Sequence, residues 1–150
     1  MVNNMKTAKS LSSGYGFQYA VKFICTSTIP GTSQTSSFPP GSYETVVNIH
    51  NPNSRAAGFR MKIAASTSTN LDTPIISEFI KEKLKPDQAT GVSCNRLQEF
   101  GLHLIHGFEG FLVIESSMSL DVVAVYTAAF KGGVVSMDVE YIRERKLRQR

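Results

Sequence analysis

The chain lacks several features that would narrow its function class at once. It has no tryptophan, only two cysteines, and 19% charged residues in a length of 150. No apolar run approaches the ~18 residues of a membrane-spanning helix, so no transmembrane segment is predicted. Cys25 and Cys94 form no CxxC motif, which excludes zinc-finger spacing. Apolar residues make up 41% of the chain, which indicates a globular domain and excludes a disordered, collagen-like or coiled-coil protein.

The first sixteen residues do not resemble a secretory signal, because they are polar and rich in Ser and Gly. A signal would need a charged start followed by an apolar stretch of ~7–15 residues. A cytoplasmic location is therefore the default expectation, with release by another route or assembly at the cell surface as alternatives. Under that expectation Cys25 and Cys94 are buried, reduced thiols, and a disulfide between strands is the alternative if the protein leaves the cell.

The net charge of +4 is concentrated at the C-terminus. Residues 143–150 account for all of it, so the rest of the chain is neutral. A nucleic-acid-binding domain would spread Lys and Arg over one face of the fold, so nucleic acid is not an expected partner. We interpret residues 143–150 as a solvated basic tail that could contact an acidic partner. Its basic residues are Arg143, Arg145, Lys146, Arg148 and Arg150.

Alternation of apolar and polar residues at every second position predicts most of the fold. Such alternation indicates half-buried β-strands, and two further segments that are apolar on both faces indicate central strands. The turn chemistry of residues 51–54 predicts that the strands on either side of it form a hairpin. The six longer predicted strands are 17–25, 43–50, 57–65, 108–115, 121–129 and 134–142.

The middle of the chain is less regular. Residues 74–84 have apolar residues at helical spacing and a poorer strand pattern, and both structures remain open. A short strand is expected at 88–94, followed by a brief helix at 96–100 that Asn95 caps and Gly101 ends. The polar connection at 26–42 is longer than an ordinary loop, which favours a functional or mobile segment.

These elements predict an all-β fold. We expect an antiparallel β-sandwich, immunoglobulin-like or jelly-roll-like, with about seven to eight strands and one or two short helices. The domain spans residues 17–142, between a flexible arm at 1–16 and the basic tail at 143–150. The predicted core contains Val21, Phe23, Val47, Ile49, Phe59, Met61, Val113, Val123, Val125, Val139 and Tyr141.

Four short segments carry a resemblance. They are YAVKF at 19–23, NIHNPNSR at 48–55, LKPDQA at 84–89 and DVVAVYTA at 121–128. Together they resemble a set of small, uncharacterised prokaryotic proteins, and their layout is similar to an immunoglobulin-like domain. The resemblance implies a fold over residues 17–142 and no activity. The chain departs from antibody domains because it has no tryptophan to pack on a core disulfide.

Candidate chemical sites are few. His103 and His106 form an HLIH pair, to which His50 could add a third metal ligand, but Glu109 is the nearest acid and metal binding is not favoured. Glu115 and Asp121 flank a short connection, where two carboxylates could pair, although strand-end acids are usually solvated. The chain contains no nucleophile elbow, dinucleotide-binding or Walker motif. We therefore predict no enzyme activity, no catalytic or metal-binding residues and no cofactor.

Two functions remain. The first is a non-enzymatic structural protein that self-assembles into a homo-oligomer or filament through sandwich edges and its terminal arm, which would order on contact with a neighbour. The basic tail could then pair with Glu44 or Glu115 of that neighbour. The alternative is a small binding module that recognises a carbohydrate or a protein through the 26–42 loop and the sandwich tip.

Overall fold

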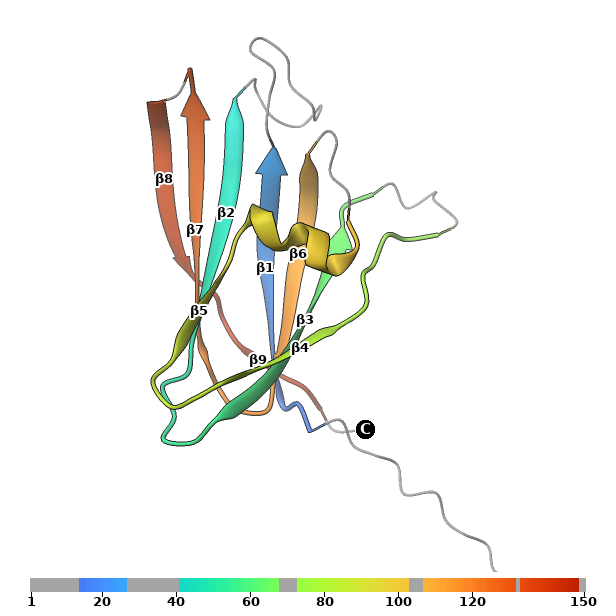
Figure 1. The fold of residues 1–150 in the computed structure, drawn as a ribbon, viewed down its shortest axis with the longest axis vertical. Coiled ribbons are helices and arrows are strands. Elements are labelled where there is room, and N and C mark those ends of the chain that lie inside the picture. Colours follow the sequence, from blue (N-terminus) through green and yellow to red (C-terminus); the bar gives the residue numbers. More distant parts are fainter. Residues whose placement is uncertain (1–13, 27–40, 68–72, 103–106, 132, 149–150) are drawn as a thin grey trace, which may run out of the picture.

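The computed structural model describes residues 14–26, 41–67, 73–102, 107–131 and 133–148. Over these residues the fold is all-β with one short 3-10 helix, as predicted (Figure 1). The elements are β1 (Phe17–Thr26), β2 (Ser42–His50), β3 (Ala57–Ala65), β4 (Ile80–Leu84), β5 (Ala89–Val92), η1 (Cys94–Phe100), β6 (Phe108–Ser116), β7 (Asp121–Phe130), β8 (Gly133–Tyr141) and β9 (Arg145–Lys146).

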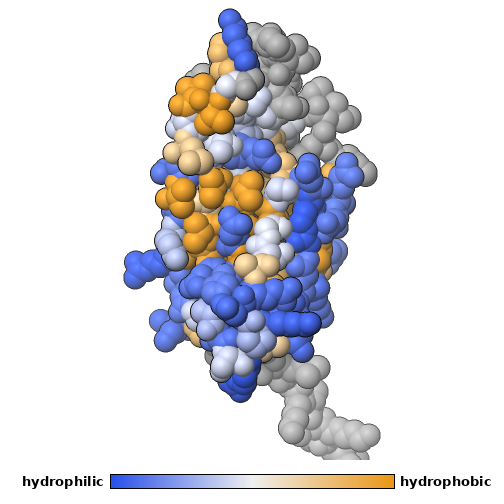
Figure 2. All heavy atoms as spheres, turned by 60° about the vertical axis from the view of Figure 1, so that its left-hand side comes forward, coloured by the Kyte–Doolittle hydropathy of each residue, from blue (hydrophilic) through white to orange (hydrophobic). Residues whose placement is uncertain are grey.

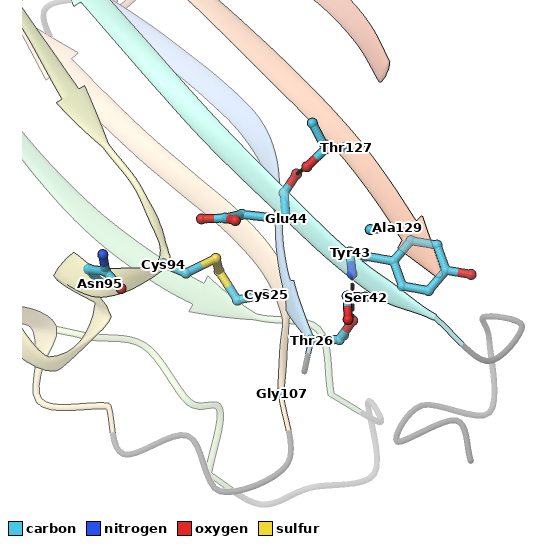
Figure 3. Close-up of a pocket in the computed structure, with 10 residues that line it drawn as sticks. All are labelled: Cys25, Thr26, Ser42, Tyr43, Glu44, Cys94, Asn95, Gly107, Thr127 and Ala129. Carbon is cyan, nitrogen blue, oxygen red and sulfur yellow. Dashed lines mark hydrogen bonds between the residues drawn. A yellow bond between two sulfur atoms is a disulfide. The ribbon is translucent and has the colours of Figure 1, made fainter. Parts of the chain in front are cut away.

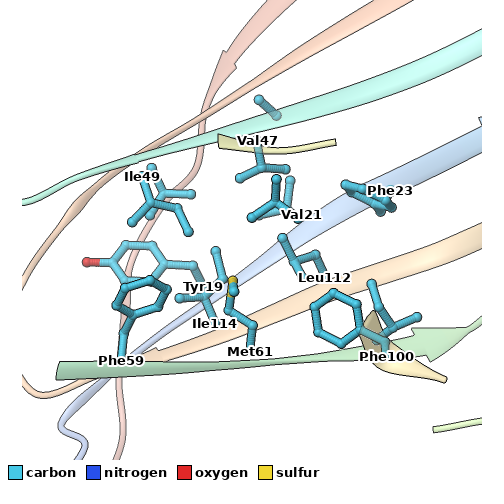
Figure 4. Close-up of a cluster of buried hydrophobic side chains, with 14 of the residues drawn as sticks. Tyr19, Val21, Phe23, Val47, Ile49, Phe59, Met61, Phe100, Leu112 and Ile114 are labelled. Atoms are coloured by element: carbon cyan, nitrogen blue, oxygen red, sulfur yellow. The ribbon is translucent and has the colours of Figure 1, made fainter. Parts of the chain in front are cut away.

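All nine strands belong to one antiparallel sheet that curls on itself. The strand order is β4-β3-β6-β1-β2-β7-β8, with β5 added to β2 and β9 added to β1. The β1–β2 ladder is short, since only Cys25 with Glu44 and Thr26 with Tyr43 are paired. Beyond that ladder the two halves of the sheet separate and enclose the core between them, which gives the fold its sandwich-like form (Figure 4).

Thr45 marks the place where the two halves separate. Its side chain is buried, and its Oγ1 accepts a hydrogen bond of 3.0 Å from the backbone N–H of Ile24. A side-chain oxygen thus replaces the main-chain acceptor that a continuous ladder would supply. From here β2 turns its side chains Val47 and Ile49 into the core, where both are fully buried.

The predicted hairpin between β2 and β3 is wrong. These strands lie in different halves of the sheet, so residues 51–56 cross between the halves. Asn51 holds the crossing: it is fully buried, and its Nδ2 donates to the carbonyls of Arg55, Leu84 and Lys85 at 2.8, 3.2 and 3.0 Å. A side chain that satisfies three backbone groups does the work of a ladder that the crossing cannot form.

The core prediction is correct for the first three strands. Val21, Phe23, Val47, Ile49, Phe59 and Met61 are all fully buried (Figure 4). In β6 and β7 the facing is wrong by one residue, because Leu112, Ile114, Val122 and Ala124 are buried, whereas Val113, Val123 and Val125 are only partly buried. In β8 the prediction fails outright, since Val139 and Tyr141 are 57% and 75% exposed.

The middle of the chain forms strands. Residues 80–84 are β4, and Ile76 bridges to Ala64, so the helix considered for 74–84 does not form. Pairing with the edge of β3 outweighs the helical spacing. β5 confirms the expected short strand, and η1 ends at Gly101, whose φ of 74° suits glycine. The N-cap of η1 is Ser93 and not Asn95.

The segment interpreted as a solvated tail is partly built into the fold. Arg145 and Lys146 form β9 and pair with Gln18 and Phe17 of β1. The N–H of Leu147 donates to the carbonyl of Gly16 at 2.8 Å, which extends this pairing. Main-chain hydrogen bonds to the edge of β1 therefore hold the chain at 145–147 in spite of its charge. The rest of the expected arm, residues 1–13, lies outside the described residues.

Candidate functional site

A cavity of about 400 Å³ opens at the tip of the sandwich (Figure 3). It lies where the ends of β1, β2 and β7 meet the start of η1. Its polar lining includes the hydroxyls of Thr26, Ser42 and Thr127, the carboxylate of Glu44 and the amide of Asn95. Such a lining can hydrogen-bond a small polar molecule. The described lining residues are Cys25, Thr26, Ser42, Tyr43, Glu44, Cys94, Asn95, Gly107, Thr127 and Ala129.

A disulfide between Cys25 and Cys94 forms one wall of this cavity (Figure 3). The expectation of two reduced thiols is therefore wrong. The two residues are 69 positions apart, and the fold brings their Cα atoms to 5.7 Å by placing the start of η1 beside the end of β1. The disulfide fastens η1, which contributes Leu97 and Phe100 to the core, to a central strand.

The most unusual surface of the molecule is the outward face of β8. Paired residues of neighbouring strands share a face, so Tyr141, Val139 and Met137 lie beside Val123, Val125 and Thr127 of β7. The register of β2 adds Val46, Asn48 and, beside Thr127, Glu44 to the same side of the sheet. We call the following residues the β8 face: Val46, Val123, Val125, Met137, Val139 and Tyr141.

The β8 face is apolar and open to solvent. Met137 is 67% exposed, and Val134 and Val135 at one end of the strand are more than 70% exposed. Figure 2, viewed from the side that carries β8, shows hydrophobic side chains gathered in the middle and polar ones around them. Sequence reasoning found the apolar alternation of β8 but assigned it to the core.

The opposite side of β8 is polar. Ser136, Asp138 and Glu140 alternate with the residues of the β8 face, and the Tyr126 hydroxyl donates to Glu140 Oε2 at 2.9 Å. Burial and then the hydrogen bond to the Glu140 carboxylate raise the pKa of Tyr126. The two sides of β8 thus differ sharply: one carries no charge and the other carries two acids.

A second cavity, of about 380 Å³, lies between the outer side chains of β1 and β6 and the segment that joins β8 to β9. Phe111, Ala20 and Ile142 supply apolar surface there. Its charged residues are Lys22, Glu140, Arg143 and Arg145. Lys22 is paired with Glu109 at 2.6 Å, so the bases of this cavity are partly neutralised.

His50 lies between two carboxylates. Its Nδ1 is 2.8 Å from Asp121 Oδ2, and its Nε2 is 2.9 Å from Asp87 Oδ1. Hydrogen bonds to Asp121 and then Asp87 raise the pKa of His50. The contact joins the β4–β5 turn to the ends of β2 and β7. The candidate ligands His103 and His106 lie outside the described residues, and among the described ones no group suited to hold a metal ion is found.

Glu115 and Asp121 do not form the carboxylate pair considered above, because each has a different partner. Glu115 is buried and accepts from Arg60 at 2.5 Å, while Asp121 contacts His50. Arg96 of η1 is paired with both Glu82 and Glu99, and its guanidinium lowers the pKa of Glu99. These ion pairs connect neighbouring elements and are typical of structural contacts.

Comparison with known proteins adds little to this geometry. No family model and no curated protein matches the chain. A solved structure described as the crystal structure of Thermotoga maritima 1070 is similar over 81% of this chain and 91% of that chain, with a TM-score of 0.49 and 11% identity. A similarity of that size carries no inference about function. Within the described residues, no helix has the length and apolar character needed to cross a membrane.

Proposed function

We propose that this protein is a non-enzymatic structural subunit that self-assembles into a homo-oligomer through β8 and the β8 face. The observation that carries the proposal is a strand whose apolar row is exposed along its whole length. Monomeric proteins rarely leave contiguous apolar patches of this kind in water, and such patches mark association surfaces.

A second copy of the chain suits this surface better than a charged partner does. The six residues of the β8 face carry no charge, so two copies can bring these residues together without like-charge repulsion between them. Glu44 lies on the same side of the sheet, but two strands away from β8. Val, Met and Tyr side chains gain free energy when they lose contact with water, and Tyr and Met are enriched at such interfaces. The surface is therefore self-complementary in chemistry.

The test is the mass of the purified full chain with and without the apolar row. The double variant Met137→Thr/Val139→Thr keeps residues suited to a strand and removes much of the apolar surface. Light scattering should show a multiple of 16.5 kDa for the natural sequence and a shift toward 16.5 kDa for the variant. Phe111→Thr, at a 42% exposed residue on β6, is the matched control and should leave the mass unchanged. Equal masses for all three proteins would contradict the proposal.

The disulfide supports a location for this assembly. Disulfides persist in oxidising surroundings, such as the cell surface or the exterior, and are rare in the reducing cytosol. We propose that the subunit functions outside the cytosol, in place of the cytoplasmic default. Alkylation of free thiols in intact source cells should leave Cys25 and Cys94 unmodified, and quantitative modification of both would contradict this location.

A second candidate function is the binding of a small polar ligand, such as a carbohydrate, in the tip cavity. Its volume of about 400 Å³ falls within the ~300–1,000 Å³ of small-molecule sites. The 26–42 loop named for this function lies outside the described residues from 27 to 40. Monosaccharides should raise the melting temperature of the natural protein but not of Glu44→Gln. No change with any sugar would count against this function.

A further inference from the structure

The edge of β8 has hydrogen-bonding groups that face away from the rest of the sheet. The N–H of Ile142 donates to the carbonyl of Val122 at 2.9 Å. Because antiparallel ladders alternate, the even-numbered residues 136–142 direct their backbone groups at β7. The backbone N–H and C=O groups of Met137, Val139 and Tyr141 therefore point to the open edge, and β8 ends the strand order of the described residues. One of these groups has a local partner, since the N–H of Val139 donates to Asp138 Oδ1 at 3.0 Å and would have to exchange this bond for one to a second strand.

We propose that two copies of β8 pair antiparallel about a two-fold axis that passes through Met137. The inference rests on the proposed function and specifies its geometry. In such a pair, each β8 strand would supply hydrogen-bond partners for the backbone groups at the open edge of the other. The residues whose backbone groups point to the open edge are also those whose side chains belong to the β8 face. Pairing therefore joins the two β8 faces into one apolar surface and places Met137 against Met137 of the second copy.

Strand length favours this register. Met137 is the middle residue of β8, which runs from Gly133 to Tyr141. An axis at Met137 therefore overlaps the whole of both strands, and any other axis leaves residues at one end unpaired. β8 carries a bulge at Val135, because Ala128 of β7 pairs with Ser136 and the next residue, Ala129, pairs with Val134. The regular part of the new ladder is therefore expected to be centred on residues 136–138.

Charge disfavours the two neighbouring registers nearer the end of β8. Side chains directly opposite in antiparallel strands lie ~4.5–5.5 Å apart, and diagonal ones ~7–8 Å. With the axis at Met137, Asp138 lies opposite Ser136 of the second copy and Glu140 lies opposite Val134. An axis at Asp138 would set that residue against itself. An axis at Val139 would set Asp138 against Glu140 twice. Of these three registers, the Met137 register keeps the acids farthest apart, so the acidic row disfavours the other two.

Spin labels on the polar row measure the register without altering the β8 face. Single variants Ser136→Cys, Asp138→Cys and Glu140→Cys are labelled on the full chain without reductant, which preserves the Cys25–Cys94 disulfide. Dipolar coupling between the two copies then reports one distance for each site. Lys85→Cys, on the exposed β4–β5 turn, is the control and should give no short distance.

The Met137 register predicts a defined pattern of distances. Labels at 136 and 138 should be equally close, because each is offset from its twin by two residues, ~7 Å along the strand. The label at 140 should be farther, with an offset of six residues or ~20 Å. A shortest distance at 138, with 136 and 140 equal, would overturn the proposal in favour of an Asp138 axis. Equal short distances at 138 and 140 would likewise indicate a Val139 axis.

The same samples separate this proposal from the proposed function. An oligomer by mass with any other pattern of distances, or with none between β8 strands, would refute the register and leave self-assembly standing. A 16.5 kDa species under labelling conditions would refute both. Binding of β8 to a different protein would then be the remaining use of this edge.

Discussion

Reduction of the Cys25–Cys94 disulfide should cost much of the stability of the fold. The bond closes a loop of 69 residues and fastens η1 to the end of β1. The chain-entropy relation for a loop of that length gives about 4 kcal/mol at 25 °C, because the unfolded chain regains the freedom that the bond removes. If the free energy of unfolding falls by about 2 kcal/mol per M of urea, the urea concentration at the unfolding midpoint should fall by roughly 2 M.

The assay compares urea unfolding of the same protein before and after treatment with a phosphine reductant. This comparison changes no other atom, so cavity effects of a Cys25→Ala substitution do not enter. A thiol assay on the native protein should find no free thiol before treatment and two after it. A midpoint shift worth less than 1 kcal/mol, with complete reduction, would refute the reasoning that the bond constrains η1 and β1.

Three further changes test the fold at single residues. Asn51→Leu removes the donor shared by the carbonyls of Leu84 and Lys85 and should cost about 2–4 kcal/mol of unfolding free energy, so an unchanged urea midpoint would contradict its role at the crossing. Phe59→Ala should cost about 3–5 kcal/mol, because the ring is fully buried, and a loss under 1 kcal/mol would show that its facing is wrong. The contacts of His50 raise its pKa, so their stabilisation is complete below pH ~6.5 and is lost as pH rises through the higher folded-state value. Urea midpoints at pH 5.5 and 8.5 should therefore differ less for His50→Gln than for the natural protein, and equal differences would contradict the assignment.

The strands could be predicted from the sequence where polar residues mark one face. In β1, β2 and β3, residues such as Lys22 and Arg60 alternate with the core residues, so the alternation fixes which side chains face inward. In β6 and β7 both faces are apolar, so the sequence does not show which face of the strand points to the core. This is why Val113 was assigned to the core in place of Leu112 and Ile114.

The candidate site could not be predicted for a different reason. The sequence of β8 shows an apolar row and a polar row, and this pattern is the same whether a neighbouring layer covers the apolar row or not. The facing of Val139 and Tyr141 depends on where β8 lies in the sheet, at the end of the strand order. The disulfide was missed for a related reason, since a separation of 69 residues says nothing about distance in space.

Asn51 illustrates a signal that was present but misread. Its turn chemistry was interpreted as a hairpin, because asparagine and proline favour tight turns. The structure uses the same amide to satisfy carbonyls from two separate segments, the crossing itself at Arg55 and the residue after β4 at Lys85. From the sequence alone, an asparagine whose amide donates to three carbonyls cannot be distinguished from one that only forms a turn.

Sedimentation equilibrium of the full, oxidised chain over a wide concentration range tests the central claim, self-assembly through β8, most directly. We predict a species with an even number of subunits, because a two-fold axis through β8 pairs the chains. Its mass should be twice 16.5 kDa or a multiple of that value. A single species of 16.5 kDa at every concentration would contradict the account.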